Sequence, residues 1–267
     1  MHKKIKLFVT LFLLFNTFLL AKDLEIIKIF TDQKIDGTIV IESLKTKKRF
    51  IHNGTRANRL LLPASTFKIP HTLIALNEGI VTKDSVLIWD KEIRDIESWN
   101  KDQTLKSAFQ NSCVWCYKEF TSKIPIEKYK KYLKDIDYGN KSIGLNLNDF
   151  WLDGSLKINT YGQIKFLKKL QANNLPFKAE DLDFVKEIMI EDKNDDYTLR
   201  AKTGYSKTSE SEMGLYIGYI ETSDDVWFFV TNILIKSEKD LAKRKEITLE
   251  VLKAKGIIKG KEQWIMR

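Results

Sequence analysis

Segments rich in β-branched and apolar residues predict strands near both ends of the chain. Residues 36–52 predict a hairpin, with a β-branched run that returns after a polar turn. Three later segments, 197–202, 214–220 and 226–235, are likewise rich in β-branched and apolar residues and predict strands. The polar stretch 221–225 predicts a hairpin between the last two.

Between these strands the apolar positions recur at helical spacing. Each predicted helix keeps its apolar residues three or four positions apart, and glycines end two of them, Gly79 and Gly256. The predicted helices are 65–78, 105–120, 126–133, 161–172 and 238–255. Strands at both ends of a helical middle predict an α+β fold. In it, an antiparallel β-sheet built from both chain ends is flanked by helices and carries an inserted helical lobe.

The first 21 residues have the pattern of a secretory signal. Three lysines precede an apolar run from Leu7 to Leu20, and Ala21 offers a small residue for cleavage. The alternative is a retained N-terminal anchor, although a membrane span needs about 20 apolar residues. We expect a periplasmic or secreted protein with no stable membrane insertion once the leader is removed. The rest, 22–267, forms a single domain, with a sheet lobe at about 22–60 and 195–267 and a helical lobe at about 61–194.

The charge distribution argues against nucleic acid as a partner. The formal net charge of +9 falls to +6 without the three leader lysines, and acidic and basic residues are mixed along the chain. A mildly positive field would still help to collect an anionic small molecule.

Cys113 and Cys116 have the C-x-x-C spacing of redox motifs and of half a zinc site. The chain has no second cysteine pair, and its three histidines do not cluster with this one. We therefore expect no metal site here, but two small buried side chains on a helix. A disulfide stays possible in an oxidising compartment, although cysteines three apart on a regular helix are poorly placed for one.

Ser65 and Lys68 form the first candidate for catalysis. On a helix, residues three apart share a face, so the hydroxyl and the amine are neighbours. A serine becomes a good nucleophile when a base takes its proton, and burial among apolar residues turns lysine into such a base by disfavouring its charged form. By itself, S-x-x-K is a weak signal, and Ser65 could equally be a helix N-cap.

Lys202, Thr203 and Gly204 form the second candidate. They end a β-like run before a polar turn, where a strand edge would place Lys202 beside a pocket. Glycine allows close approach of a ligand to the backbone. Lysine and threonine could hold a carboxylate there, but K-T-G could also be just a strand and a turn.

The motifs gain weight from their order: Ser65-Thr-Phe-Lys68, then Ser112-Cys113-Val114, then Lys202-Thr-Gly204. S-x-x-K with S-D-N and K-T-G marks class A β-lactamases and penicillin-binding proteins. Here the middle motif differs. With Tyr138-Gly-Asn140 and Phe150-Trp151-Leu, the set resembles the class D, or oxacillinase-type, serine β-lactamases, over nearly all of the chain after the leader.

The resemblance implies hydrolysis of β-lactam antibiotics through a serine acyl-enzyme, and hence β-lactam resistance. Lys68 would be carbamylated by CO₂ (N6-carboxylysine) and act as general base, with no metal or other cofactor. Val114 would keep its pocket dry, and Trp151 would donate its indole N–H to the carbamate. Without the motifs, Val114 and Trp151 would be ordinary core residues.

Further roles follow from the same resemblance. Ser112 would carry a proton to the leaving ring nitrogen, and the backbone N–H groups of Ser65 and Tyr205 would form the oxyanion hole. Arg244 would bind the substrate carboxylate, although its lysine neighbours at 243 and 245 leave the register open. Two rivals share these motifs: a penicillin-binding protein acting on peptidoglycan, and a β-lactam sensor domain.

Overall fold

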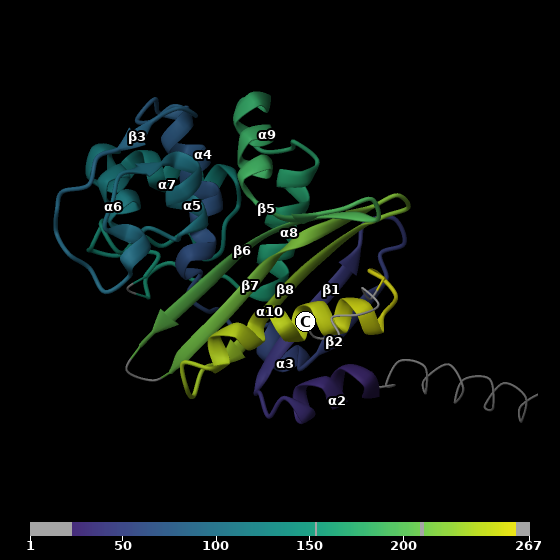
Figure 1. The fold of residues 1–267 in the computed structure, drawn as a ribbon. Coiled ribbons are helices and arrows are strands. Elements are labelled where there is room, and N and C mark those ends of the chain that lie inside the picture. Colours follow the sequence, from purple (N-terminus) through teal and green to yellow (C-terminus); the bar gives the residue numbers. More distant parts are fainter. Residues whose placement is uncertain (1–22, 153, 209–210, 260–267) are drawn as a thin grey trace, which may run out of the picture.

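The computed structural model describes residues 23–152, 154–208 and 211–259, and the predicted leader lies outside them. Its main feature is a six-stranded antiparallel sheet of order β2-β1-β8-β7-β6-β5 (Figure 1). The strands are β1 (Gly37–Ser43), β2 (Arg49–His52), β5 (Ile190–Lys193), β6 (Tyr197–Lys207), β7 (Glu212–Thr222) and β8 (Val226–Leu234). A small second sheet pairs β3 (Val86–Leu87) with β4 (Gln103–Thr104).

Most of the helices lie between β2 and β5 in the chain. Only α2 precedes the sheet strands and only α10 follows them among the described helices. In chain order the described helices are α2 (Leu24–Asp32), α3 (Gly54–Ala57), α4 (Lys68–Asn77), α5 (Leu105–Gln110), α6 (Val114–Lys123), α7 (Ile126–Asp135), α8 (Thr160–Gln171), α9 (Ala179–Ile188) and α10 (Asp240–Ala254). Two 3₁₀ helices, η1 (Ala64–Phe67) and η2 (Glu97–Trp99), complete the described elements. Within the described ranges, none of these helices combines the length and apolar character needed to cross a bilayer.

The sheet joins the two ends of the chain, because β1 pairs with β8 over seven positions, from Gly37 with Ile233 to Ser43 with Trp227. Every residue of β1 is buried, as expected for a strand covered on both faces. The predicted α+β class, with a sheet from both chain ends and an inserted helical lobe, is confirmed.

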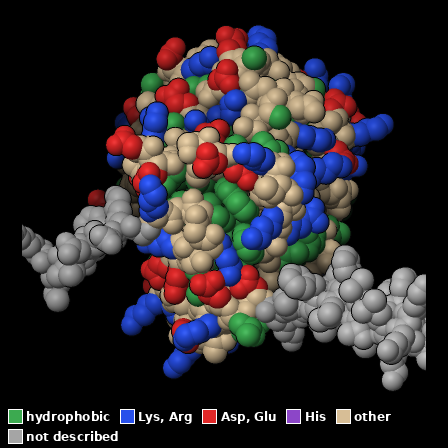
Figure 2. Space-filling view, turned by 90° about the vertical axis from the view of Figure 1, so that its right-hand side faces the viewer, with side chains coloured by type: hydrophobic (Ala, Val, Ile, Leu, Met, Phe, Trp, Pro, Cys, Tyr) green, Lys and Arg blue, Asp and Glu red, His purple; other side chains and the backbone are tan. Residues whose placement is uncertain are grey.

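The two faces of the sheet bury two separate cores. Side chains alternate along a strand, so Ile39 and Ile41 lie in the core shared with α2 and α10, whereas Val40 lies in the core shared with the helical lobe. In Figure 1, α2 and α10 cross one face of the sheet, and helices α4 to α7 form the lobe at its far end. On the face shown in Figure 2, acidic and basic side chains are mixed.

Several predicted boundaries were wrong. The predicted helix 105–120 is two helices, α5 and α6, separated by a break at residues 111–113. The β6 strand continues to Lys207, so the K-T-G residues lie inside a strand and do not end it before a turn. The sequence did not predict α2, α9 or β5, and β5 joins the sheet although its residues were assigned to the helical lobe.

Candidate active site

Ser65 lies in η1, directly before α4. Its neighbour Ala64 has a φ of 46°, a conformation that non-glycine residues rarely adopt. Pro63 is the N-cap of η1 and makes no side-chain cap bond, so the N-cap alternative for Ser65 is wrong. The Ser65 side chain is only 8% exposed. Ser65 thus lies in a constrained and nearly buried turn, a setting typical of a reactive group rather than of a surface cap.

Lys68 begins α4, and its Nζ lies 3.3 Å from Oγ of Ser65, as the S-x-x-K spacing predicts. Lys68 is completely buried. Burial, together with the charge of Lys202, holds the pKa of the Lys68 amine well below its ordinary value. The amine also lies 4.7 Å from the centre of the Tyr117 ring. An uncharged lysine at this distance from a hydroxyl can act as a base.

Trp151 is fully buried against the first turn of α4. Its ring stacks on Phe67 at 6.2 Å and meets His71 edge-on at 5.0 Å, so it packs on residues either side of Lys68. The indole Nε1 is buried and has no hydrogen-bond partner among the described residues. An orphan N–H of this kind is costly to bury. It therefore indicates that an acceptor not contributed by the described side chains belongs there.

Ser112 lies within the break between α5 and α6, and Val114 is the first residue of α6. Ser112 has a φ of 56°, and Cys113 is the N-cap of α6. Because Ser112 has a left-handed backbone conformation, the chain changes direction there between α5 and α6. Val114 is only partly buried.

Ser112 and Lys202 come together from the two lobes. Nζ of Lys202 lies 2.5 Å from Oγ of Ser112, and it also reaches the carbonyl and hydroxyl oxygens of Thr203, at 3.1 and 3.4 Å. Burial, with the charges of Arg244 and Lys245, lowers the pKa of Lys202 to about 7. The pair can therefore exchange a proton near neutral pH.

Gly204 allows η1 to pack on β6. A Cβ at this position would lie 3.1 Å from Cγ2 of Thr66 and 3.2 Å from the carbonyl oxygen of Pro63. Strand β5 pairs only with residues 198–200 of β6, so the edge of β6 from residue 202 onward faces the site instead. The backbone at Gly204 and Tyr205 thus lies against the turn that carries Ser65. The Tyr205 side chain itself is 40% exposed and bonds to Glu212.

Arg244 makes a hydrogen bond to the backbone of the K-T-G strand. Its Nη1 donates to the carbonyl oxygen of Gly204 at 3.4 Å, and its buried Nε has no partner in the described part of the chain. Lys243 instead bonds to Asp240, and Lys245 to Glu191. The contact with Gly204 thus supports the predicted register.

Tyr138 and Asn140 fix the segment that follows Trp151. The Asn140 amide donates to Ser155 O at 2.9 Å and accepts from Lys157 N at 2.9 Å. Tyr138 bonds through Gln163 to Thr66 beside the nucleophile, at 3.3 and 3.0 Å. Tyr138-Gly-Asn140 is therefore more than a simple turn, because it links the Trp151 segment to η1.

A cavity of about 260 Å³ opens beside Lys202. Its lining combines Lys202 and Thr203 with apolar groups from α5 and from residues 188–190. Lys245 and its ion-pair partner Glu191 also contribute to the wall. The cavity thus adjoins the K-T-G strand, and its lining includes neither Ser65 nor Lys68.

Cys113 and Cys116 form a disulfide, and both side chains are fully buried. The expected burial is thus confirmed and the disulfide that the sequence left possible is present, but the two residues do not share one helix, because Cys113 precedes α6. Cys113 precedes the first turn of α6 and has a non-helical ψ of 109°. The two Cα atoms are 5.5 Å apart, a usual distance for a disulfide.

Sequence reasoning missed two residues around Lys68. His71 is fully buried one turn further along α4, and its Nε2 lies 2.7 Å from the Tyr129 hydroxyl. Its position three residues after Lys68 is a signal that could have found it. Tyr117 has no such local signal, because only the packing of α6 against α4 brings its ring beneath Lys68.

The family model for the penicillin-binding protein transpeptidase domain matches residues 37–253. Among curated proteins, the chain is similar to β-lactamase OXA-48 of Klebsiella pneumoniae, with 42% identity over 86% of this chain and 87% of the relative. It is also similar to the probable β-lactamase YbxI of Bacillus subtilis (strain 168), with 36% identity over 89% of this chain and 88% of that one.

Solved structures give the same result. The chain superimposes on FUS-1 (OXA-85), a class D β-lactamase from Fusobacterium nucleatum subsp. polymorphum, with a TM-score of 0.86 and 38% identity, covering 89% of this chain and all of that one. A class D β-lactamase from Sebaldella termitidis gives a TM-score of 0.84 at 39% identity, over 87% of this chain and 96% of that one.

Proposed function

The chain belongs to the penicillin-binding protein transpeptidase family and, within it, to the class D β-lactamases, and from this we infer that it hydrolyses β-lactam antibiotics and confers resistance to them. The observation that carries the mechanism proposed below is the fully buried Lys68 amine, 3.3 Å from the Ser65 hydroxyl. Membership of class D also implies that no metal cofactor takes part.

In the first step that we propose, Ser65 attacks the lactam carbonyl while its proton passes toward Lys68. The new C–O bond converts the carbonyl into a tetrahedral oxyanion. Backbone N–H groups of Ser65 and Tyr205 would stabilise this charge. The close packing of η1 on Gly204 supports the assignment, because it brings the two backbone segments together.

Collapse of the tetrahedral intermediate breaks the C–N bond of the ring, and the leaving nitrogen needs a proton. Ser112 would donate its hydroxyl proton and recover one from Lys202. The 2.5 Å contact between the two side chains and the Lys202 pKa of about 7 support this relay. The product is an acyl-enzyme on Ser65.

The pocket fits a carboxyl group on Nζ of Lys68. An amine kept neutral by burial can combine with CO₂, and the orphan indole N–H of Trp151 offers a donor to the resulting anion. Such a group would supply an oxygen that can accept a proton, which a lysine ammonium cannot do, both from Ser65 and from the water that releases the acyl-enzyme. Val114 would limit the access of solvent at the edge of this pocket.

Substrate binding would use cations on and beside β6. Penicillins and cephalosporins carry a carboxylate next to the lactam ring, and a guanidinium matches its planar geometry. Arg244 lies against Gly204 with its Nε unpaired within the described chain, and Lys202 and Thr203 are its neighbours. We propose that these three residues, with Gly204 allowing close approach, bind the carboxylate.

Because residues 1–21 are predicted to be a signal peptide, we also propose that the enzyme is exported. After removal of residues 1–21, the single domain 22–267 would act in the periplasm or outside the cell. Cleavage is testable by N-terminal sequencing of the protein recovered from the periplasm or the culture medium.

The deciding experiment is turnover of a chromogenic cephalosporin by the purified protein, with and without added bicarbonate. Many turnovers per enzyme, faster with bicarbonate after decarboxylation at low pH, are the expected result. A single stoichiometric burst would instead indicate slow deacylation, as in a penicillin-binding protein or a sensor domain, and would overturn the proposal.

A further inference from the structure

The segment from Ser112 to Tyr117 contacts both lysines of the active site. At its start, the Ser112 hydroxyl lies 2.5 Å from Nζ of Lys202. At its end, the Tyr117 ring lies 4.7 Å from Nζ of Lys68. The spacing between Ser112 and Tyr117 therefore helps to set the surroundings of both lysines at once.

The disulfide lies between these two contacts. Cys113 directly follows Ser112, and Cys116 directly precedes Tyr117. The Cys116 backbone N–H donates to Sγ of Cys113 at 3.4 Å, so the bond also closes the first turn of α6. Ser112 has a φ of 56°, which a free backbone rarely adopts. A covalent link next to this residue opposes its relaxation.

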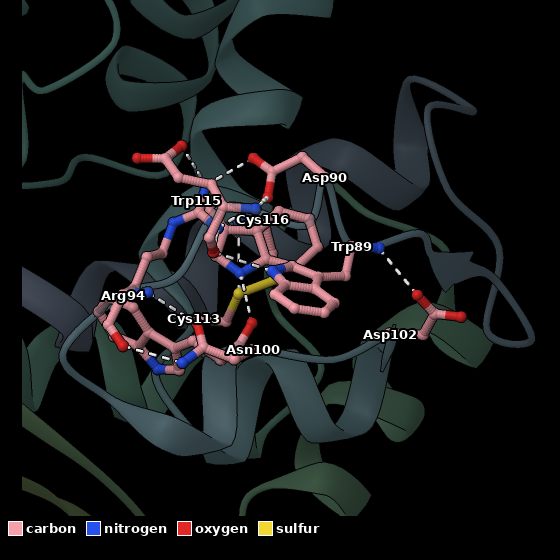
Figure 3. A network of polar contacts seen from close by, with 10 residues as sticks. Trp89, Asp90, Arg94, Asn100, Asp102, Cys113, Trp115 and Cys116 are labelled. Atoms are coloured by element: carbon pink, nitrogen blue, oxygen red, sulfur yellow. Dashed lines mark hydrogen bonds and ion pairs between the residues drawn. A yellow bond between two sulfur atoms is a disulfide. The ribbon is translucent and has the colours of Figure 1, made fainter.

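Trp99, which lies outside this segment, bonds to Asn111 just before it and to Trp115 within it. Trp99 Nε1 donates to the carbonyl oxygen of Asn111 at 2.8 Å, and Trp115 Nε1 donates to the carbonyl oxygen of Trp99 at 3.0 Å. Arg94 lies over the Trp115 ring at 5.4 Å. Arg94, Trp115 and the disulfide lie together on this side of the segment (Figure 3). The hydrogen bonds support the ends of the turn, and only the disulfide ties its two sides covalently.

We propose that the Cys113–Cys116 disulfide is a positioning element for catalysis, which fixes Ser112 against Lys202 and the Tyr117 ring against Lys68. This inference rests on the proposed function, because it requires Lys68 to act as an uncharged amine that captures CO₂. Cys113 and Cys116 touch neither substrate nor reacting atoms, and they act through their neighbours.

A role in global stability is the simpler alternative, but the short loop argues against it. The entropic stabilisation from a disulfide grows with the length of the chain that it closes, and here the cysteines are only three positions apart. Loss of the bond should therefore change the pocket more than it changes the melting temperature.

The test compares the wild type with the double variant Cys113→Ala/Cys116→Ala. Both are decarboxylated at low pH, returned to neutral pH, and assayed with a chromogenic cephalosporin over a range of bicarbonate concentrations. We expect the variant to need at least tenfold more bicarbonate for half-maximal turnover, with a melting temperature within a few degrees of the wild type. Carbon-13 NMR with labelled bicarbonate should show a correspondingly weaker carboxylated-lysine signal.

Reduction of the wild type is a second arm, should the variant fold poorly. A dithiol attacks one sulfur, forms a mixed disulfide, and leaves as a cyclic disulfide, so the enzyme gains two electrons and two protons as free thiols. Alkylation and mass measurement would verify the reduced state. The reduced wild type should reproduce the bicarbonate requirement of the variant, and the dithiol should leave the variant itself unchanged.

The outcomes separate this inference from the proposed function. Equal bicarbonate requirements for wild type and variant, or a loss that bicarbonate does not restore, would overturn the positioning role while leaving the β-lactamase assignment intact. Failure of the oxidised wild type to turn over any β-lactam would overturn the proposed function itself.

Discussion

Lys202 and Ser112 are 90 positions apart in the chain, yet their side chains meet at 2.5 Å. One comes from the sheet and the other from the break between two helices of the inserted lobe. The contact would place the proposed proton relay at the junction of the two lobes, where a substrate bound between them would meet it.

Replacement of Lys68 by alanine should remove the base. We expect turnover of a chromogenic cephalosporin to fall by at least 100-fold, with an acyl adduct on Ser65 detectable by mass spectrometry if acylation persists. Lys106→Ala on α5, an exposed lysine, is the control and should retain full activity. Bicarbonate should not restore Lys68→Ala; full turnover of this variant would refute the assignment.

Trp151→Phe keeps a large aromatic ring and removes the indole N–H. The orphan donor is buried, so its removal should cost little folding stability but should weaken retention of CO₂ on Lys68. We expect turnover without added bicarbonate to drop about 10- to 100-fold and to recover substantially when bicarbonate is added. A defect insensitive to bicarbonate would mean that Trp151 serves packing alone.

Arg244→Ala should raise KM about 10- to 100-fold for substrates with a ring carboxylate and change kcat less, because the guanidinium is assigned to binding. Lys243→Ala is the matched control on the same helix turn, since Lys243 pairs with Asp240 instead. The KM values of the two variants, measured by initial rates, decide which residue of α10 binds the substrate carboxylate. A larger increase in KM for Lys243→Ala than for Arg244→Ala would contradict the assignment to Arg244.

Gly204→Ala should separate η1 from β6. The new Cβ would press on Cγ2 of Thr66 and on a backbone oxygen of Pro63. We expect a loss of about 1–3 kcal/mol in the free energy of unfolding and roughly tenfold lower kcat/KM. Gly54→Ala, where the nearest atom lies at 3.8 Å, should be neutral. Urea unfolding and initial rates would measure both variants, and unchanged activity in Gly204→Ala would argue against a tight fit.

Lys202 should make stability depend on pH in the alkaline range. Burial lowers its pKa from 10.5 to about 7, so between these values the unfolded chain binds a proton that the folded protein lacks. The destabilising contribution is complete below pH 7 and vanishes above 10.5, and the free energy of unfolding rises between them by at most about 1.4 kcal/mol per pH unit. Urea unfolding at pH 7.5 and 9.5 should show this gain reduced in Lys202→Met. Equal rises in the free energy of unfolding for the wild type and Lys202→Met would contradict this role of Lys202.

Local chemistry explains what the sequence could predict. Ser65 and Lys68 share a helical face because they are three residues apart, so their contact needs no knowledge of the rest of the fold. Five of the six strands of the main sheet, all except β5, followed from composition in the same way. The resemblance to class D enzymes then assigned Trp151, Ser112 and Arg244 to one site.

Tertiary packing determines what the sequence could not predict. Tyr117 reaches Lys68 only because α6 packs on α4. The Cys113–Cys116 disulfide joins the N-cap of α6 to its first turn, because α6 begins at Val114. The sequence predicted one continuous helix over 105–120 and therefore missed this boundary. The break between the two helices depends on the positive φ of Ser112, and no local sequence pattern predicted this conformation.

The pairing of β1 with β8 has a consequence for how the molecule forms. Gly37 finds its partner Ile233 only after nearly the whole polypeptide is available, so the central seam of the sheet closes late. Contacts this distant along the chain slow folding. Until that closure, Lys202 has no fixed place opposite Ser112, and a growing or truncated polypeptide would lack catalytic power even with its nucleophilic turn complete.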